Sequence, residues 1–99
     1  MHARSGILQV SPDRVDDAVQ AFTSNQAPKY KEANGYKGFV LLADRQSGKI
    51  LGVSFWDSES DLQASDELGA AARSEIQESG GGSEEPVRET WEVVYDDMA

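Results

Sequence analysis

The segment from Tyr36 to Trp56 constrains the fold most, because it is apolar on two sides. Two strand-like runs, 36–43 and 50–56, flank the polar stretch Asp44-Arg45-Gln46-Ser47-Gly48-Lys49, in which Gly48 suits a positive φ. This arrangement predicts a β-hairpin. Side chains alternate between the two faces of a strand. Here each strand carries apolar side chains on both faces: in the first run Phe39 and Leu41 oppose Val40 and Leu42, and in the second Leu51, Val53 and Phe55 oppose Ile50 and Trp56.

A helix is predicted before the hairpin. Ser11 is a suitable N-cap, and Pro12 suits the first helical position, where no backbone donor is needed. Pro28 predicts that this helix ends or kinks near Ala27. The buried stripe has three- and four-residue spacing, typical of an amphipathic helix, and consists of Val15, Ala18, Val19 and Phe22.

A second helix is predicted after the hairpin, from Ser58 to Glu78, with Ser58 and Asp61 spaced as in a capping box. Its buried face comprises Leu62, Leu68, Ala72 and Ile76. Ser79-Gly80-Gly81-Gly82-Ser83 predicts a flexible stop. Gly6 to Val10 and Val87 to Tyr95 read as the first and last strands. The order predicts a single α+β domain over residues 1–99: a ferredoxin-like βαββαβ fold, with two helices on one face of a four-stranded antiparallel sheet.

The two-sided hairpin predicts a homodimer. Two helices can cover only one face of the sheet, so the apolar side chains on the other face need water, a ligand or another protein. Exposed apolar patches of this kind commonly mark interaction surfaces. A second copy related by a two-fold axis is the commonest partner. The alternative is a single covered core, with the tails wrapped over the open face.

Composition excludes several classes of function. The chain has no cysteine and no apolar run near the ~20 residues that a membrane span needs, so we expect a cytoplasmic protein without membrane contact. Its net charge of −9 argues against nucleic-acid binding. His2 is the single histidine, and we expect it at a frayed terminus. The sequence therefore predicts no metal site and no cofactor.

The stretch Gly35-Tyr36-Lys37-Gly38-Phe39, followed by Asp44-Arg45, Gly48-Lys49 and Val53-Ser54-Phe55-Trp56-Asp57-Ser58-Glu59, resembles the dimeric α/β-barrel superfamily. The similarity is strongest to its antibiotic-biosynthesis monooxygenase-like domains. The resemblance implies a dimeric α/β barrel, in which two sheets pack face to face. Members of this family include cofactor-independent oxygenases of aromatic polyketides and haem-degrading oxygenases.

The family's better-known catalytic pattern places an Asn on the first strand and a Trp, with or without a His, on the second helix. The first strand here reads Arg4-Ser5-Gly6-Ile7-Leu8-Gln9, and the helix from Ser58 to Glu78 contains neither Trp nor His. Both departures argue against the two oxygenase activities, and most strongly against haem.

Aromatic and polar side chains near the strand ends are the candidate ligand-binding residues: Tyr30, Asn34, Tyr36, Trp56, Trp91 and Arg88. Tyr36 and Trp56 are the candidate catalytic residues, since a Tyr hydroxyl could orient or deprotonate a phenol. Arg88 or Arg4 could hold an anionic group. Each aromatic has a structural alternative in the core or the dimer interface, and Asn34 before Gly35 suits a turn.

Three functions remain open. The first is a binding domain for a small aromatic or apolar molecule. The second is a cofactor-independent monooxygenase acting on an aromatic, polyketide-like substrate or a related isomerase. The third is a structural dimer module without a ligand.

Overall fold

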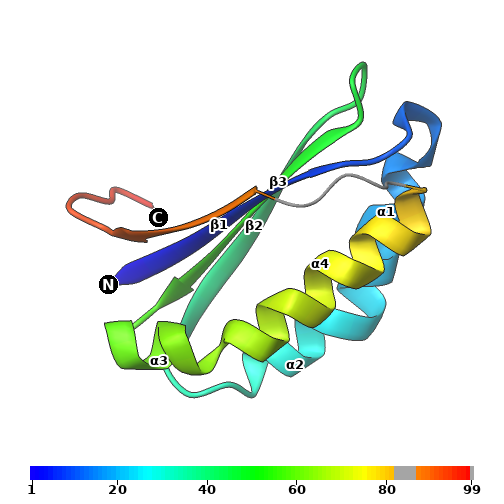
Figure 1. Ribbon diagram of the computed structural model, residues 1–99. Coiled ribbons are helices and arrows are strands. Elements are labelled where there is room, and N and C mark those ends of the chain that lie inside the picture. Colours follow the sequence, from blue (N-terminus) through cyan, green and yellow to red (C-terminus); the bar gives the residue numbers. More distant parts are fainter. Residues whose placement is uncertain (82–86, 99) are drawn as a thin grey trace.

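The computed structural model describes residues 1–81 and 87–98, and its four strands form one antiparallel sheet in the order β2-β3-β1-β4 (Figure 1). The strands are β1 (His2–Gln9), β2 (Tyr36–Asp44), β3 (Lys49–Trp56) and β4 (Val87–Glu92). Each pairing is antiparallel, with β1 between β3 and β4. The predicted α+β class and ferredoxin-like βαββαβ order are confirmed.

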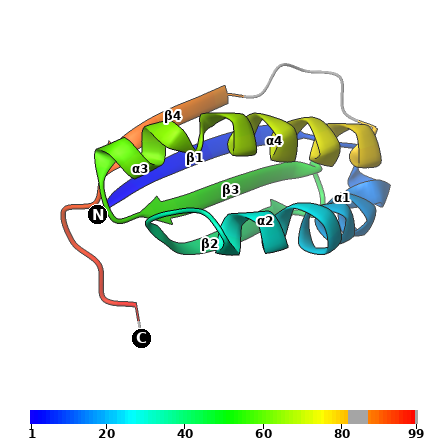
Figure 2. The same cartoon turned by 90° about the horizontal axis from the view of Figure 1, so that it is seen from below.

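All helices lie on one face of this sheet, in two rows (Figure 2). One row lies over β2 and β3, and the other lies over β1 and β4. The first row consists of the 3₁₀ turn Pro12–Arg14, α1 (Val15–Ala21), the π-helical turn Phe22–Gln26 and α2 (Ala27–Lys31). The second consists of α3 (Glu59–Ala64) and α4 (Asp66–Gly80).

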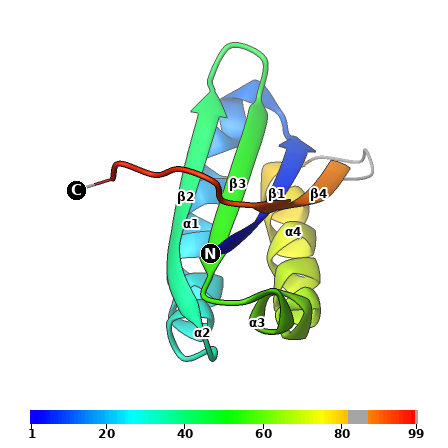
Figure 3. The ribbon, with the colours of Figure 1, turned by 90° about the vertical axis from the view of Figure 1, so that its left-hand side faces the viewer.

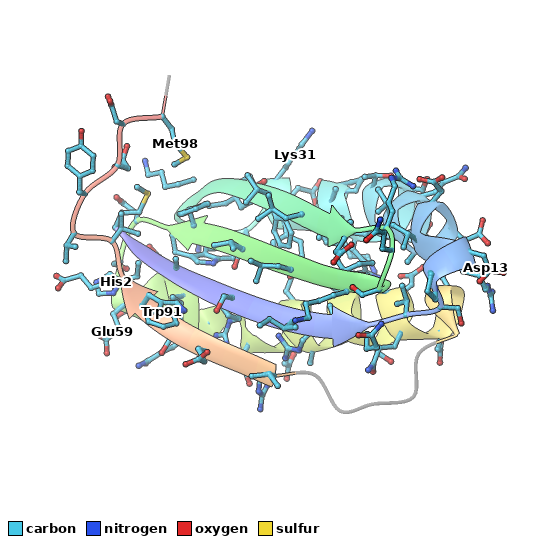
Figure 4. The ribbon with its side chains drawn as sticks, turned by 90° about the horizontal axis from the view of Figure 1, so that it is seen from above. His2, Asp13, Lys31, Glu59, Trp91 and Met98 are labelled. Carbon is cyan, nitrogen blue, oxygen red and sulfur yellow. The ribbon has the colours of Figure 1, made fainter. Side chains whose placement is uncertain are left out.

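The register of the strands gives the sheet two distinct faces. Arg4, Gly6 and Leu8 of β1 pair with Ser54, Gly52 and Ile50 of β3, and these positions face the helices. The opposite face carries the remaining apolar side chains of the hairpin, of which Val40 is 40% and Leu42 is 53% exposed. The predicted two-sided hairpin is confirmed. Figure 4 looks onto this open face.

An aromatic cluster fills the core beneath the first helical row. Trp56 is fully buried, and its Nε1 donates a hydrogen bond to Ser54 Oγ at 2.8 Å. Tyr30 packs against Phe39 with ring centroids 5.0 Å apart and lies 6.2 Å from the Trp56 ring. Tyr36 meets Trp56 edge-on at 5.9 Å. These edge-to-face arrangements are favourable beyond the area they bury.

The first helical row runs further than the sequence predicts. Pro28 does not end it, because Pro28 occupies the first turn of α2, where its missing N–H is not needed. The π-helical turn Phe22–Gln26 lies directly before α2 and joins it to α1. Ser11 is the N-cap residue as predicted, with Pro12 following it, but it caps through its backbone: its carbonyl oxygen accepts from Arg14 N at 2.9 Å, and its hydroxyl makes no capping bond.

The second row is also divided. Ser58 caps α3 as predicted, accepting from Asp61 N at 3.1 Å. The continuous helix to Glu78 is wrong, since the row breaks at Ser65 between α3 and α4. Ser65 is buried, and its hydroxyl donates to the Leu62 carbonyl at 2.6 Å, which satisfies a backbone acceptor at the break.

The ends of the sheet differ from expectation in two places. His2 is not frayed, since it belongs to β1 and pairs with Trp56 on one side and Glu92 on the other. The last strand ends at Glu92 and not at Tyr95, and the segment after it leaves the sheet (Figure 3). The predicted turns hold, with positive φ at Gly35 and Gly48. Gly81 ends α4 in the left-handed conformation. The expected flexible stop is wrong at Ser79 and Gly80, which belong to α4, and Gly82 and Ser83 lie outside the described residues.

Glu75 joins the two helical rows. Its carboxylate on α4 accepts hydrogen bonds from the side-chain amides of Asn25 and Gln26 in the π-helical turn. These bonds, that from Gln26 first, lower the pKa of Glu75 from its ordinary value. Gln26 is buried, so its amide depends on this acceptor.

We expect Trp56→Phe to destabilise the fold by about 1–3 kcal/mol, because the buried Ser54 hydroxyl loses its donor. Trp91→Phe is the matched control. Trp91 Nε1 also donates to a serine, Ser5 Oγ at 2.8 Å, but Trp91 is 53% exposed in the single chain. Both changes are therefore made in the Leu42→Lys chain, whose added charge on the open face should prevent pairing, so that water can replace the donor lost from Trp91. Urea unfolding followed by the fluorescence of the remaining tryptophan measures both changes. An equal loss in the two variants would contradict the core role of Trp56.

We expect stability to fall in acid partly through Glu75. Its pKa is lower in the folded chain than the ordinary 4.5, so its contribution is present above 4.5 and is lost as the pH falls through the folded value. Glu75→Gln should lower the melting temperature at neutral pH and flatten its decline in acid. Glu78→Gln, an exposed change on the same helix, should do neither. Parallel melting curves for Glu75→Gln and the parent chain would show that Glu75 plays no such part.

Candidate ligand site between helices and sheet

A small cavity lies between the second helical row and the sheet, with a volume of about 30 Å³. Its floor is the helix-facing side of β1, β2 and β3, and its roof is α4 and Tyr30 of α2. The lining is mainly apolar and aromatic, with the polar groups of two arginines, one tyrosine and one serine. The residues are Arg4, Gly6, Leu8, Tyr30, Phe39, Leu41, Gly52, Ser54, Gly69, Ala72, Arg73 and Ile76.

Three glycines create this space. Gly6 and Gly52 are paired across β1 and β3, and Gly69 faces them from α4. A Cβ on Gly6 would meet only the Arg73 side chain, at 3.5 Å, which is an ordinary contact. A Cβ on Gly69 would lie 3.1 Å from Arg73 Nη1. A Cβ on Gly52 would lie 3.2 Å from Phe39 Cζ and 3.3 Å from Leu41 Cδ2. The space beside Gly52 is therefore taken up by Phe39 and Leu41, and the space beside Gly6 and Gly69 is shared by the cavity and Arg73.

Two arginines extend into the same space. Arg4 of β1 donates from Nη1 to Asp66 Oδ1 at 3.0 Å and from Nη2 to the Leu62 carbonyl at 2.9 Å. Its Nε is buried and has no partner among the described residues. Arg73 of α4 forms no salt bridge and donates no hydrogen bond within residues 1–81 and 87–98.

The charge at this point is unbalanced. Burial, and then the nearby charges of Arg88 and Arg4, lower the pKa of Arg73. Asp66 is the carboxylate that these cations share, 3.0 Å from Arg4 Nη1 and 3.6 Å from Arg88 Nη1. Three cations and one carboxylate leave a local excess of positive charge, in a chain whose net charge is −9.

Tyr30 supplies a hydroxyl to the cavity. Burial raises its pKa to about 12, even though Arg73 and Arg4 act in the opposite direction. The hydroxyl is therefore protonated at neutral pH and can donate a hydrogen bond to an acceptor in the cavity. No carboxylate or histidine is found among the described residues that line the cavity, so the lining offers donors and no obvious base.

An open groove of about 690 Å³ adjoins this cavity along α3 and the β1–β4 edge. Arg4 lines both hollows, so the cavity and the groove lie next to each other at its side chain. His2, Glu59 and Trp91 belong to the groove, and Figure 4 shows them at the same end of the sheet. Among the described residues, no group of histidines and carboxylates is arranged to hold a metal ion.

The predicted site residues do not all lie together. Tyr30 lines the cavity, and Trp56 packs behind it as a fully buried core residue. Tyr36 contacts both rings, and burial raises the pKa of its hydroxyl. Asn34 is exposed in the turn before β2.

Two further candidates lie on β4. Trp91 pairs with Ala3 and is directed to the open face of the sheet, away from the helices. Arg88 pairs with Gly6 on the helix side, where it approaches Asp66 and lines a second open hollow with Arg4. Of the two, only Arg88 is close to the cavity's arginines.

Sequence reasoning missed Arg73 and the three glycines. Arg73 is the lone base among nine acids between Asp57 and Glu85, and that isolation was a usable signal. It also lies four residues after Gly69, which places both on one face of a helix. The glycines gave no comparable signal, because their pairing across strands depends on the register.

The comparisons with known proteins concern sequence and fold. No family model matches the chain. Two uncharacterized proteins of Mycobacterium tuberculosis H37Rv are similar in sequence: Rv2557, 30% identical over 94 residues, and Rv2558, 33% identical over 73 residues. The chain spans 41% of the first and 31% of the second. The described part of the chain contains no helix long and apolar enough to cross a membrane.

Solved structures match over nearly the whole chain. A monooxygenase from the ActVA-Orf6 gene of Streptomyces coelicolor, bound to nanaomycin D, has a TM-score of 0.78 at 15% identity, covering 99% of this chain and 91% of that one. The haem degrader MhuD of Mycobacterium tuberculosis has a TM-score of 0.74 at 19% identity, covering 99% and 100%. A Deinococcus radiodurans protein described as a possible antibiotic biosynthesis monooxygenase has a TM-score of 0.73 at 15% identity, covering 100% and 98%.

These matches agree with the element order, the sheet topology and the one-sided helical layer described above. The resemblance inferred from the sequence is confirmed at the level of fold: this chain has the fold of the antibiotic-biosynthesis monooxygenase-like proteins of the dimeric α/β-barrel superfamily.

Proposed function

We propose that this chain is a homodimeric binding domain that holds a small, largely aromatic or apolar molecule between its helices and its sheet. The observation that carries the proposal is the cavity left by Gly6, Gly52 and Gly69. Glycine inside a strand or helix costs roughly 0.5–1 kcal/mol relative to alanine. Three glycines that meet at one place lower the stability of the fold. They therefore fit a binding site that must stay open better than a core that serves stability alone.

The lining supports this class of ligand. Leu8, Phe39 and Ile76 provide apolar walls, and Tyr30 and the two arginines provide a few polar groups. Binding sites for small molecules commonly combine these features. The bound ligands named for two proteins of similar fold, nanaomycin D and haem, are themselves polycyclic and aromatic.

Binding is favoured over oxygenation by the chemistry of the lining. A base that could take a proton from a phenol is missing among the described lining residues, and Tyr30 has a pKa of about 12. The candidate catalytic Trp56 is fully buried, with its Nε1 already bonded to Ser54. Tyr36 and Trp56 fit a supporting role behind the cavity.

The open face of the sheet supports pairing with a second copy. Leu51, Val53 and Phe55 of β3 lie on this face beside the exposed Val40 and Leu42 of β2. No helix among the described residues covers it (Figure 1). An apolar face of this extent commonly belongs to an interface, and a two-fold axis would let each copy cover the other.

We expect filling the cavity to strengthen the free protein and weaken binding. Gly6→Ala and Gly69→Ala should each raise stability by about 0.5–1 kcal/mol, because glycine is the less favourable residue in strand and helix. The same added methyl groups should reduce the thermal shift given by a panel of hydroxylated polycyclic phenols. A ligand selective for the native state raises the melting temperature.

Ser74→Ala is the matched control for these variants. Ser74 is exposed on α4, so the change raises helix propensity without reaching the cavity. It should leave the ligand-induced shift unchanged. If no member of the panel shifts the melting temperature, or if the glycine variants bind as well as the parent, the proposed site is wrong.

We expect the chain to have twice its own mass in solution at micromolar concentration. Leu42→Lys places a charge on the open face at a side chain that is 53% exposed in the single chain, so it should yield folded monomers. Ala70→Lys adds the same charge on the exposed surface of α4 and should leave the dimer intact. Light scattering coupled to size exclusion measures both. A monomeric parent chain would overturn the pairing.

A further inference from the structure

We propose that the ligand carries a carboxylate, and that Arg4 and Arg73 bind this group at the neck between the enclosed cavity and the open groove. The inference rests on the proposed function and adds the chemical class of the ligand. It predicts a small aromatic carboxylate whose apolar part lies toward Leu8, Phe39 and Ile76.

The first argument is that Arg73 lacks a partner. Two other cations, Arg88 and Arg4, repel its guanidinium more strongly than Asp66 attracts it, and within the described chain it has neither a salt bridge nor a hydrogen bond. Arg73 is half-buried, and a charge partly removed from water is stabilised when it is paired. An anionic ligand would supply the missing charge, and the excess of positive charge at this point would fall.

The second argument is the position of Arg4. Its Nη1 and Nη2 are held by Asp66 and by the Leu62 carbonyl, which fixes the plane of the guanidinium. The remaining donor, Nε, is buried and lacks a partner in the described residues, and the Arg4 side chain that carries it lines the cavity. A fixed donor without an acceptor fits a ligand oxygen better than it fits an empty apolar wall.

The size of the enclosed space favours a carboxylate over a larger anion. About 30 Å³ is room for roughly two water molecules. A small planar group suits this space and the planar fork of arginine. A ring needs more room, and the Arg73 stem occupies it: Arg73 Cδ lies 3.5 Å from the Cβ position of Gly6. Rotation of Arg73 toward the neck would free this volume while its charge stays near the ligand.

The third argument is Tyr30. Tyr30 lines the same cavity, and its protonated hydroxyl interacts electrostatically with Arg73 and Arg4, so we expect it to donate to the second carboxylate oxygen. Donors from three different secondary-structure elements thus line one small space: Arg4 on β1, Tyr30 on α2 and Arg73 on α4. An amide or a neutral phenol would leave at least one of the charged donors uncompensated.

The test compares benzoate with benzamide, which have nearly the same shape and differ in charge. The two are titrated against the parent chain and followed by melting temperature and by isothermal calorimetry at low salt. We expect benzoate to bind about tenfold or more tightly than benzamide, as charged hydrogen bonds of this kind imply. Equal affinity for the two probes would overturn the carboxylate inference.

Substitutions then assign the effect to Arg73. Arg73→Met keeps most of the apolar stem but removes the charge, and it should abolish the preference for benzoate. Arg73→Lys should keep part of it. Arg45→Met is the control, since it changes the net charge equally but lies far along the chain on the hairpin loop, where Arg45 pairs with Asp16 at 2.8 Å. A preference for benzoate that survives Arg73→Met, or is lost in Arg45→Met, would refute the assignment.

The outcome separates this inference from the proposed function. If neutral aromatic probes bind and Gly69→Ala weakens them, while benzoate has no advantage, the cavity is a binding site and the carboxylate inference fails. If neither benzoate, benzamide nor the phenol panel binds, both fail together.

Discussion

The fold depends on one constraint: the β2–β3 hairpin is apolar on both faces, whereas the helices can cover only one. Burial of apolar surface is the main favourable term in folding, so the covered face becomes the core, with Trp56 and Ile50 almost inaccessible to water. The other face keeps Val40 and Leu42 exposed in the single chain. The same alternation that builds the core therefore creates the surface on which pairing is proposed.

On the covered face, the core is closely packed beneath the first helical row and contains the cavity beneath the second. Phe22, Tyr30, Phe39 and Trp56 pack beneath the first helical row with ring centroids 4.6–6.2 Å apart. Beneath the second row, glycines on β1, β3 and α4 replace the side chains that would meet there. The aromatic cluster can thus act as a rigid wall for the cavity, and the candidate residues Tyr36 and Trp56 belong to that wall.

The sequence predicted the fold well because its signals were local and periodic. The hairpin, the Ser58 cap and the turns at Gly35 and Gly48 follow from residues a few positions apart. The errors at Pro28, Ser65 and His2 arose where tertiary contacts decide. Neighbouring residues in sequence do not reveal that Pro28 fits the first turn of α2 or that the N-terminal residues lie between two strands. Nor do they reveal that a buried serine donates to a backbone carbonyl at the break between α3 and α4.

The candidate site was only partly predictable, for the same reason. Tyr30 and Arg88 could be named from residue type, but the meeting of Gly6, Gly52, Gly69 and Arg73 requires the register of β1 against β3 and the rotation of α4. The sequence also carried no sign that Arg4, Arg73 and Arg88 lie close together, since they are 69 and 15 residues apart along the chain. Asp66 forms ion pairs with Arg4 and Arg88 but acts on Arg73 only at longer range, so Arg73 is the one of these three arginines without a salt bridge in the described chain. A half-buried charge in that position is costly for stability alone, and its presence beside an open cavity is better explained by a ligand than by the fold.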